Sequence, residues 1–234
     1  MTAPVIELTR AVVRRGGATG FSMTVPRFVV APGEAVAVTG PSGSGKSTVL
    51  DALGLVLRPA EAETFRVAGT DAAALWLRRD ADGLAAVRAA RIGYILQTGG
   101  LLPFLSVRDN VGLSPALLGK PGGGDGMADL IRDLGLTPHL DKMPALLSIG
   151  ERQRAAIARA LAHRPAVLLA DEPTASLDPV NAATVLDLLL GLVRRLGAAL
   201  VLVSHDWDRV GRLGLRRYVT EATNDGGLLR EAEP

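Results

Sequence analysis

Gly40-Pro41-Ser42-Gly43-Ser44-Gly45-Lys46-Ser47-Thr48 is the stretch of sequence that decides the fold. It matches the pattern G-x-x-x-x-G-K-[ST], in which glycines let successive backbone N–H groups turn inward around a phosphate. Lys46 brings a positive charge to the β- and γ-phosphates, and the Ser47 hydroxyl is suited to ligate Mg²⁺. A short apolar strand is expected at residues 35–38 before the loop, and a helix at 47–53 after it. The sequence therefore predicts a phosphate-binding loop (P-loop) for a nucleotide.

The composition is that of a globular protein. At 234 residues, the chain can bury a sizeable core, as one large domain or as a domain with an inserted subdomain. The net charge of +2 is too small, and the basic residues too scattered, to favour nucleic acid as a partner. The chain has no cysteine, which excludes disulfides and thiolate chemistry. Because neither a secretory signal nor a membrane-spanning run is apparent, we expect a soluble, cytoplasmic protein.

The order of elements favours an α/β fold. Short β-rich runs at residues 5–8, 21–25 and 28–30 predict an antiparallel sheet beside the P-loop strand. Further strands are expected at 64–67, 91–96, 166–170 and 199–204, helices at 106–118, 127–134, 151–162 and 180–196, and a terminal hairpin from 218 to 229. Ser106 and Asp109 have the spacing of a capping box. Buried strands alternating with helices indicate a parallel sheet covered on both faces.

Two carboxylates, Asp171 and Glu172, follow the apolar strand expected at residues 166–170. Asp171 can reach the Mg²⁺ shell from such a strand end, and Glu172 can stand beside the γ-phosphate and polarise an attacking water as general base. The alternative is that two acids simply terminate a strand. Beside a P-loop we favour the catalytic interpretation.

A second anion site is predicted at Ser148 and Gly150, directly before a helix. A hydroxyl, free backbone N–H groups and the positive end of the helix dipole combine there. The alternative is an ordinary serine N-cap. Because one nucleotide does not need two cradles so far apart in one chain, we expect a second molecule to complete the first one's site.

The ordered set of motifs resembles the ATP-binding subunit of an ABC transporter. The set consists of the P-loop, Gln97, Leu147-Ser148-Ile149-Gly150-Glu151, Asp171-Glu172, Ser176-Leu177-Asp178 and His205. The resemblance implies a P-loop NTPase ABC-ATPase core with a mostly parallel sheet, an N-terminal antiparallel β subdomain and an inserted helical subdomain. It makes residues 1–234 a single domain, with the core at 1–98 and 148–234 and the helical subdomain at 99–147.

The resemblance also implies roles for individual residues. Gln97 would sense Mg²⁺ and the attacking water, His205 would contact the γ-phosphate, and Asp178 would lie on a loop that crosses to a partner cassette. The expected catalytic residues are Glu172, His205 and Gln97; the expected Mg²⁺ ligands are Ser47, Gln97 and Asp171; the expected ATP contacts are residues 40–48 with Ser148, Gly150, Glu151 and Asp178.

A finer resemblance implies the partners. Residues 91–97 and 101–111 are similar to the group of lipoprotein-releasing, macrolide-export and cell-division cassettes. That implies a second ABC cassette, identical or different, an integral membrane permease or regulator, and a location on the inner face of the cytoplasmic membrane. Two alternatives stay open: a non-transporting ABC regulator in cell-envelope remodelling, and a soluble ABC ATPase without a permease.

The apolar side chains of Leu101, Leu102, Phe104 and Leu105 allow two interpretations. They can form part of the groove that receives a permease's coupling helix, because exposed apolar clusters mark interaction sites. They can equally be the core of the helical subdomain.

Three positions depart from the family pattern. In the usual LSGGQ signature, Ile149 here replaces a glycine and Glu151 replaces the glutamine. The β-branched Ile149 disfavours a positive φ, and Glu151 brings a negative charge to where a γ-phosphate should dock. The aromatic residue expected to stack on adenine is also missing. Arg15 lies nearest that register, and since a guanidinium can stack on a base, Arg15 is our hypothesis for this contact.

Overall fold

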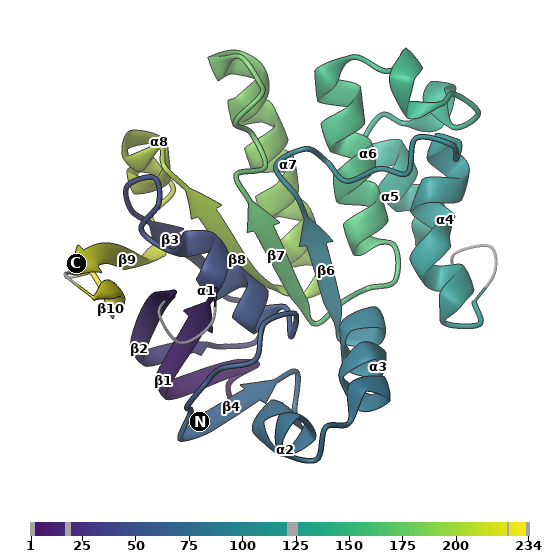
Figure 1. The fold of residues 1–234 in the computed structure, drawn as a ribbon. Helices are drawn as coiled ribbons and strands as arrows, with labels where there is room; N and C mark the ends of the chain where they lie inside the picture. Colours follow the sequence, from purple (N-terminus) through teal and green to yellow (C-terminus); the bar gives the residue numbers. More distant parts are fainter. Residues whose placement is uncertain (1–2, 17–19, 121–125, 224, 233–234) are drawn as a thin grey trace. The chain divides into compact units, whose positions relative to one another are not determined.

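The computed structural model describes residues 3–16, 20–120, 126–223 and 225–232 (Figure 1). The chain divides into two compact units, Met1–Arg88 with Ala199–Pro234, and Ala89–Ala198. The dividing point falls within helix α3 (Ala81–Arg91). This division differs from the subdomain boundaries that the motifs imply, 99–147 within 1–234, which stay a prediction.

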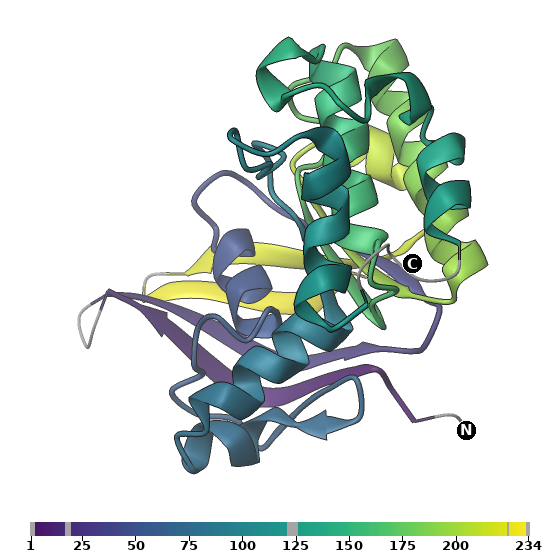
Figure 2. The same ribbon diagram turned by 90° about the vertical axis from the view of Figure 1, so that its right-hand side faces the viewer.

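The first unit holds one sheet of mixed direction. Its strands are β1 (Ile6–Arg15), β2 (Phe21–Val30), β3 (Ala35–Thr39), β4 (Thr64–Val67), β5 (Thr70–Asp71), β8 (Ala199–Ser204), β9 (Arg216–Thr223) and β10 (Gly226–Glu231). They lie in the order β5-β4-β1-β2-β10-β9-β3-β8. Strand β3 runs parallel to both β8 and β9, and Figure 2 shows the yellow hairpin of β9 and β10 beside the purple and blue strands. The helices are α1 (Lys46–Leu53), α2 (Ala72–Leu77) and α8 (Trp207–Arg212).

The predicted antiparallel pair is present, but β1 and β2 are longer than the sequence pattern indicated. The buried faces are Ile6, Leu8, Ala11 and Val13 on β1, and Met23, Val25, Phe28 and Val30 on β2. In each strand every second residue is buried, and this alternation shifts by one residue at the position where Arg10 (φ 44°) stands opposite Pro26. Proline has no N–H to donate, so the pairing skips this level and resumes in the same register. The sequence therefore looked like two strands, 21–25 and 28–30, where the chain forms one.

The second unit combines two parallel strands with helices. Strands β6 (Ile92–Ile95) and β7 (Val167–Asp171) pair from Ile92↔Val167 to Ile95↔Ala170. The helical elements are α4 (Val107–Leu117), α5 (Met127–Asp133), η1 (Thr137–His139), η2 (Pro144–Leu146), α6 (Ile149–Leu161) and α7 (Pro179–Leu196). Helix α6 packs against α4, β6 and α7. The predicted cap of α4 is confirmed, since Ser106 Oγ accepts a hydrogen bond from Asp109 N at 3.1 Å.

Most elements fall within one or two residues of their predicted positions, but β5, α2, α3, α8 and the short helices η1 and η2 were not predicted. In α3 only Leu84 is buried, although Leu84 and Val87 have helical spacing. The loose loop expected at 120–126 lies mostly outside the described residues. Among the helices that the structure describes, none is long and apolar enough to cross a membrane.

Tyr218 on β9 offers a test of the first unit's packing. Its ring centroid lies 4.4 Å from that of Phe28, and its hydroxyl donates to Val29 O at 3.1 Å and accepts from Val29 N at 3.2 Å. We expect Tyr218→Phe to lower the free energy of unfolding by about 1–3 kcal/mol, because Val29 N and Arg216 Nη1 lose the hydroxyl that accepts their hydrogen bonds. Urea unfolding measures this. Thr24→Ser, at an exposed position of β2, is the control, and equal midpoints for the two variants would contradict the prediction.

Candidate functional site

The P-loop connects β3 to α1 and folds around its own lysine. Lys46 is buried, and its Nζ donates hydrogen bonds to Gly40 O at 2.9 Å and Pro41 O at 2.8 Å. Helix α1 starts after Gly45, which has the left-handed φ of 95° that a side chain would disfavour, and no side chain caps the helix. A helix N-terminus with an adjacent ammonium is a site for an anion. The donor set therefore suits a polyphosphate.

The predicted contact Ser44 fixes the loop together with Thr220, a residue of β9 that sequence reasoning missed. Ser44 Oγ donates to Pro41 O at 2.7 Å and lies 2.5 Å from Thr220 Oγ1. The fully buried Thr220 also donates to Thr39 O at 3.2 Å. A Cβ on Gly40 would collide with Thr220 Oγ1. Strand β9 therefore leaves room for the loop only because Gly40 has no side chain.

Phe21 and Met23, two side chains of β2, lie against the loop at Gly45. A Cβ on Gly45 would come within 2.6 Å of the Phe21 ring and would also collide with Met23 Cε. No local motif could have identified Phe21 or Thr220, because their place beside the loop depends on the order of strands in the sheet.

Arg15 and His205 both belong to the unit that carries the P-loop. Arg15 ends β1, is half exposed, and forms an ion pair with Asp51 of α1. His205 is exposed and follows β8, whose last residue, Ser204, pairs with Thr39 directly before Gly40. His205 and the P-loop thus leave the carboxyl ends of neighbouring parallel strands, the edge where open α/β sheets bind ligands.

The second unit brings Gln97 near the two carboxylates. Ile95 on β6 pairs with Ala170 on β7, so Gln97 and Asp171-Glu172 leave the carboxyl ends of adjacent parallel strands. Glu172 has a φ of 47°, a left-handed conformation that costs a non-glycine residue about 1–3 kcal/mol and that Arg10, Leu55, Ala68, Arg79 and Arg164 also adopt. Its backbone is therefore constrained at the position where a general base was predicted.

Ser148 and Glu151 form a reciprocal capping box at the start of α6. Ser148 N donates to Glu151 Oε2 at 2.7 Å, and Glu151 N donates to Ser148 Oγ at 3.3 Å. The hydrogen bonds from the Ser148 backbone and side chain, with smaller electrostatic contributions from the neighbouring His139 and Lys142, hold the pKa of Glu151 below its usual range. Ile149 is the first helical residue and is 55% exposed. Its helical backbone needs no positive φ, so the predicted conflict does not arise.

Asp178 is the N-cap of α7. Its Oδ1 accepts hydrogen bonds from Val180 N and Asn181 N, both at 3.1 Å. Hydrogen bonds from the Asn181 side chain and backbone are the main cause of the lowered pKa of Asp178. The loop expected to cross to a partner therefore ends in a fixed carboxylate.

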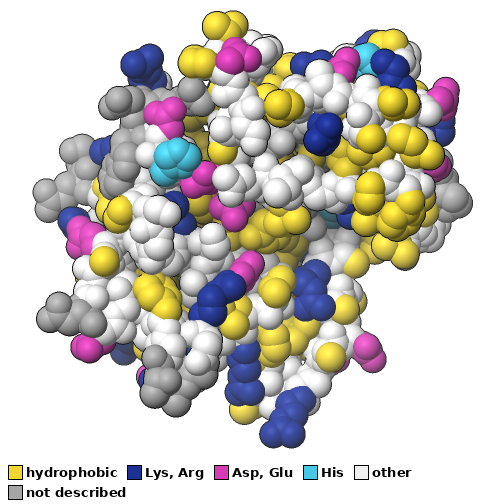
Figure 3. Space-filling view, turned by 45° about the horizontal axis from the view of Figure 1, so that its top comes forward, with side chains coloured by type: hydrophobic (Ala, Val, Ile, Leu, Met, Phe, Trp, Pro, Cys, Tyr) yellow, Lys and Arg dark blue, Asp and Glu magenta, His cyan; other side chains and the backbone are white. Residues whose placement is uncertain are grey.

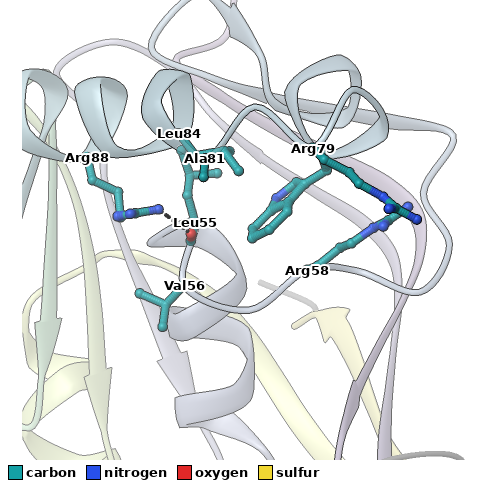
Figure 4. Close-up of a pocket in the computed structure, with 8 residues that line it drawn as sticks. Leu55, Val56, Arg58, Arg79, Ala81, Leu84 and Arg88 are labelled. Atoms are coloured by element: carbon teal, nitrogen blue, oxygen red, sulfur yellow. Dashed lines mark hydrogen bonds between the residues drawn. The ribbon is translucent and has the colours of Figure 1, made fainter.

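The first unit also has an apolar pocket of about 520 Å³ that contains none of the predicted nucleotide contacts. Figure 4 shows Arg88 at one end, where it donates to Leu55 O at 2.9 Å, and Arg58 and Arg79 at the other. The remaining lining residues are Leu55, Val56, Trp76, Ala81 and Leu84. Val56 is 63% exposed, so an apolar surface continues from the pocket to solvent.

In the second unit, the predicted apolar cluster divides between core and surface. Phe104 is 71% exposed, whereas Leu101, Leu102 and Leu105 are half-buried. The buried Asn110 clamps this segment through hydrogen bonds with Leu102 N at 2.8 Å and Leu105 O at 3.0 Å. Hydrophobic side chains also reach the surface elsewhere on the face drawn in Figure 3.

A P-loop between a buried strand and a helix, with a strand end carrying two carboxylates, defines the class as P-loop nucleotide-binding α/β proteins. The family is shown by sequence. Residues 24–175 match the ABC transporter family, so the chain belongs to it. The chain is accordingly an ATP-binding cassette and an ATPase of the ABC class.

Known relatives cover most of the chain. The lipoprotein-releasing system ATP-binding protein LolD of Novosphingobium aromaticivorans is 40% identical over 223 residues, which are 91% of this chain and 97% of the relative. The macrolide export ATP-binding/permease protein MacB 1 of Aeromonas hydrophila is 47% identical over 182 residues, 76% of this chain but 27% of the relative. These relatives confirm the expected resemblance to the lipoprotein-releasing and macrolide-export type.

A solved structure supports the same fold. The dimeric ATP-binding cassette MJ0796, in a post-hydrolysis state bound to ADP and Pi, has a TM-score of 0.77 and 31% identity, with 97% of this chain and 98% of that chain covered. The predicted fold class is confirmed.

Thr220 is expected to support ATP binding through Ser44. Thr220→Val keeps the side-chain shape but removes the hydroxyl, so we expect ATP affinity to fall about 2- to 10-fold, the effect of one hydrogen bond. Thr220→Ser keeps the hydroxyl and should bind ATP as the parent does. Equilibrium titration with a fluorescent ATP analogue measures both. Equal affinities for the valine and serine variants would refute the role of the hydroxyl.

Proposed function

We propose that this chain binds ATP with Mg²⁺ as one member of a pair of cassettes, identical or different, and transmits their ATP-driven closure to an integral membrane partner. The observation that carries the proposal is the presence of two anion cradles in one chain. One is the P-loop around Lys46, and the other is the N-terminus of α6 at Ser148. Pairing would set each P-loop against the other chain's Ser148-Gly150 segment. The dimeric cassette MJ0796 is a precedent for such a pair.

The residues of the P-loop would bind the phosphates. Lys46 would leave the carbonyl oxygens of Gly40 and Pro41 to reach the β- and γ-phosphates, while Ser44 Oγ, 2.7 Å from Pro41 O, remains to hold the loop. Residues 40–48 would contribute backbone N–H groups and hydroxyls. In the paired state Ser148, Gly150, Glu151 and Asp178 would complete the contacts from the other chain. Each of these contacts favours the closed state because it needs the γ-phosphate.

Ser47, Gln97 and Asp171 would hold Mg²⁺, since a hydroxyl, an amide oxygen and a carboxylate are the hard oxygen donors that this ion prefers. When bound, the ion would neutralise charge on the phosphate oxygens. Glu172 would accept the proton of the attacking water as general base, and Gln97 would orient that water. His205, at the end of β8, would contact the γ-phosphate. All five residues lie at the carboxyl ends of parallel strands or in the first turn of α1.

Arg15 would stack on the adenine ring. Its ion pair with Asp51 ties it to α1, the helix that begins in the P-loop. We expect Arg15→Ala to weaken ATP binding about 3- to 10-fold, in the range of a cation–π contact. Asp51→Asn is the matched control, since it breaks the ion pair but leaves the guanidinium. An unchanged ATP affinity for Arg15→Ala would remove Arg15 from the site.

The membrane partner would dock on apolar surfaces of the cassette. The pocket beside Val56 and the exposed Phe104 supply such surfaces, one in each unit, and the arginines at 58, 79 and 88 favour a helix that carries acidic residues. This docking would hold the chain on the inner face of the cytoplasmic membrane. A transport permease is the favoured partner, and a non-transporting regulator of cell-envelope remodelling or a permease-free ATPase is the alternative. Nucleic acid is not an expected partner.

Copurification separates these alternatives. We expect a membrane protein with several spanning helices to be retained by the wild-type chain from detergent-solubilised membranes and lost with Phe104→Asp, because a charge cannot enter an apolar interface without a large desolvation cost. A membrane regulator accompanied by a periplasmic enzyme would point to signalling. Retention by both variants alike would exclude Phe104 from the docking surface.

Glu172→Gln tests the function most simply. The amide cannot accept the proton of the attacking water, so ATP turnover should fall at least 10²-fold, the usual contribution of a general base. ATP binding should survive, and the variant should accumulate as an ATP-bound dimer in size-exclusion chromatography with light scattering. Lys46→Ala in the same background is the control, because it should abolish the ATP-dependent dimer. Normal turnover by Glu172→Gln would contradict the proposed role.

A further inference from the structure

A chain of three charged or polar side chains leads to the start of α6. Lys142 Nζ lies 3.1 Å from His139 Nδ1, His139 Nε2 lies 3.0 Å from Glu151 Oε1, and Glu151 Oε2 accepts the hydrogen bond of Ser148 N. His139 and Glu151 are only 16% and 21% exposed in their side chains. Both carboxylate oxygens of Glu151 therefore have a donor.

The chemistry of the end members fixes the direction of these hydrogen bonds. An ammonium has donors only, so Lys142 donates to His139 Nδ1, which must accept. The imidazole proton then resides on Nε2 and is donated to Glu151 Oε1. A glutamine at position 151 could still accept from Ser148 N with its oxygen, but its amide nitrogen would oppose the Nε2–H of His139. Glu151, His139 and Lys142 are therefore a matched set.

The main chain that carries His139 and Lys142 is itself anchored. Val107 N donates to Lys142 O at 2.9 Å and Arg108 N donates to Leu140 O at 2.8 Å, so the first turn of α4 holds the segment. Lys142 N in turn donates to His139 O at 3.0 Å. The imidazole thus projects toward Glu151 from a fixed backbone.

We infer that His139, backed by the positive charge of Lys142, is a positioning residue that orients Glu151 by hydrogen bonding to its carboxylate, so that the start of α6 can receive the γ-phosphate of the other chain's nucleotide. The inference rests on the proposed function. It accounts for the carboxylate of Glu151, which stands where the usual LSGGQ signature has an amide. The positive charge of Lys142, linked to Glu151 by the hydrogen bonds of His139, offsets a negative charge that would otherwise repel the phosphate.

The test compares dimerisation with nucleotide binding in the Glu172→Gln background. We expect His139→Leu and Lys142→Met each to weaken ATP-dependent dimerisation about 5-fold or more in sedimentation equilibrium, the effect of a partly exposed charged hydrogen bond. Lys142→Arg, which keeps a positive donor beside His139, should dimerise as the parent does. ATP affinity at concentrations where the protein is monomeric should stay unchanged, because the P-loop belongs to the other unit of the chain. A general folding defect would not produce this split.

A double-mutant cycle makes the assignment specific. With glutamine at position 151, His139→Leu should change dimerisation less than 2-fold, because its partner carboxylate is gone. Asp141→Asn is the matched control: it removes the neighbouring ion pair with Arg108 without touching Glu151 and should have no effect.

The outcomes that would overturn the inference also separate its failure from that of the proposed function. If His139→Leu leaves dimerisation unchanged, or weakens it equally with glutamate and glutamine at position 151, His139 does not act through Glu151. If the Glu172→Gln parent forms no ATP-dependent dimer, the proposed function and the inference fall together. If that dimer forms and is lost with Ser148→Arg but is indifferent to His139, only the inference fails.

Discussion

A loop that turns its N–H groups inward around an anion cannot pack a core of its own, so its shape has to be imposed by what surrounds it. Here the hydroxyls of Ser44 and Thr220 meet at 2.5 Å beneath the loop, and Gly40 approaches β9 so closely that any side chain would collide with Thr220. The C-terminal hairpin therefore fixes the conformation of a motif that is about 180 residues away in sequence. This contact depends on the sheet of the first unit, because β9 reaches the loop by pairing with β3.

In the second unit, the predicted anion site at the start of α6 is likewise held in shape by residues around it. The start of α6 is held by a capping box, and the capping carboxylate is held by His139 on a segment bonded to α4. The arrangement explains how a signature with glutamate in place of glutamine keeps a regular helix N-terminus. Ile149 causes no strain there, because the helix begins with it and its side chain points into solvent.

Sequence alone predicted the elements that have a strong pattern. The P-loop, the capped start of α4 at Ser106 and the buried strands at 166–170 and 199–204 each carry a local signal, and the structure has elements at all of them. The long β1–β2 pair was read as shorter pieces because Arg10 and Pro26 reverse the buried parity of both strands at once. Helix α3 was not predicted, although Leu84 and Val87 have helical spacing in its sequence.

The supports of the site were beyond reach of sequence patterns for a different reason. Thr220, Phe21 and His139 belong to no motif, and each matters only through a neighbour that pairing or packing brings close. Conversely, the motif residues Gln97, Asp171, Glu172 and His205 were identified as an ordered set. Their positions at the ends of parallel strands follow from the same alternation of strands and helices that predicted the fold.

The central claim is that two chains share each nucleotide, and cysteine crosslinking tests it most directly because the chain has no cysteine of its own. Ser42 in the P-loop and Ile149 at the start of α6 are both exposed, so cysteines there can be oxidised. In a Glu172→Gln background, a mixture of Ser42→Cys and Ile149→Cys chains should form a disulfide-linked pair when ATP is added, and neither variant should do so alone. No crosslink in the mixture, or one that forms equally without ATP, would contradict the account.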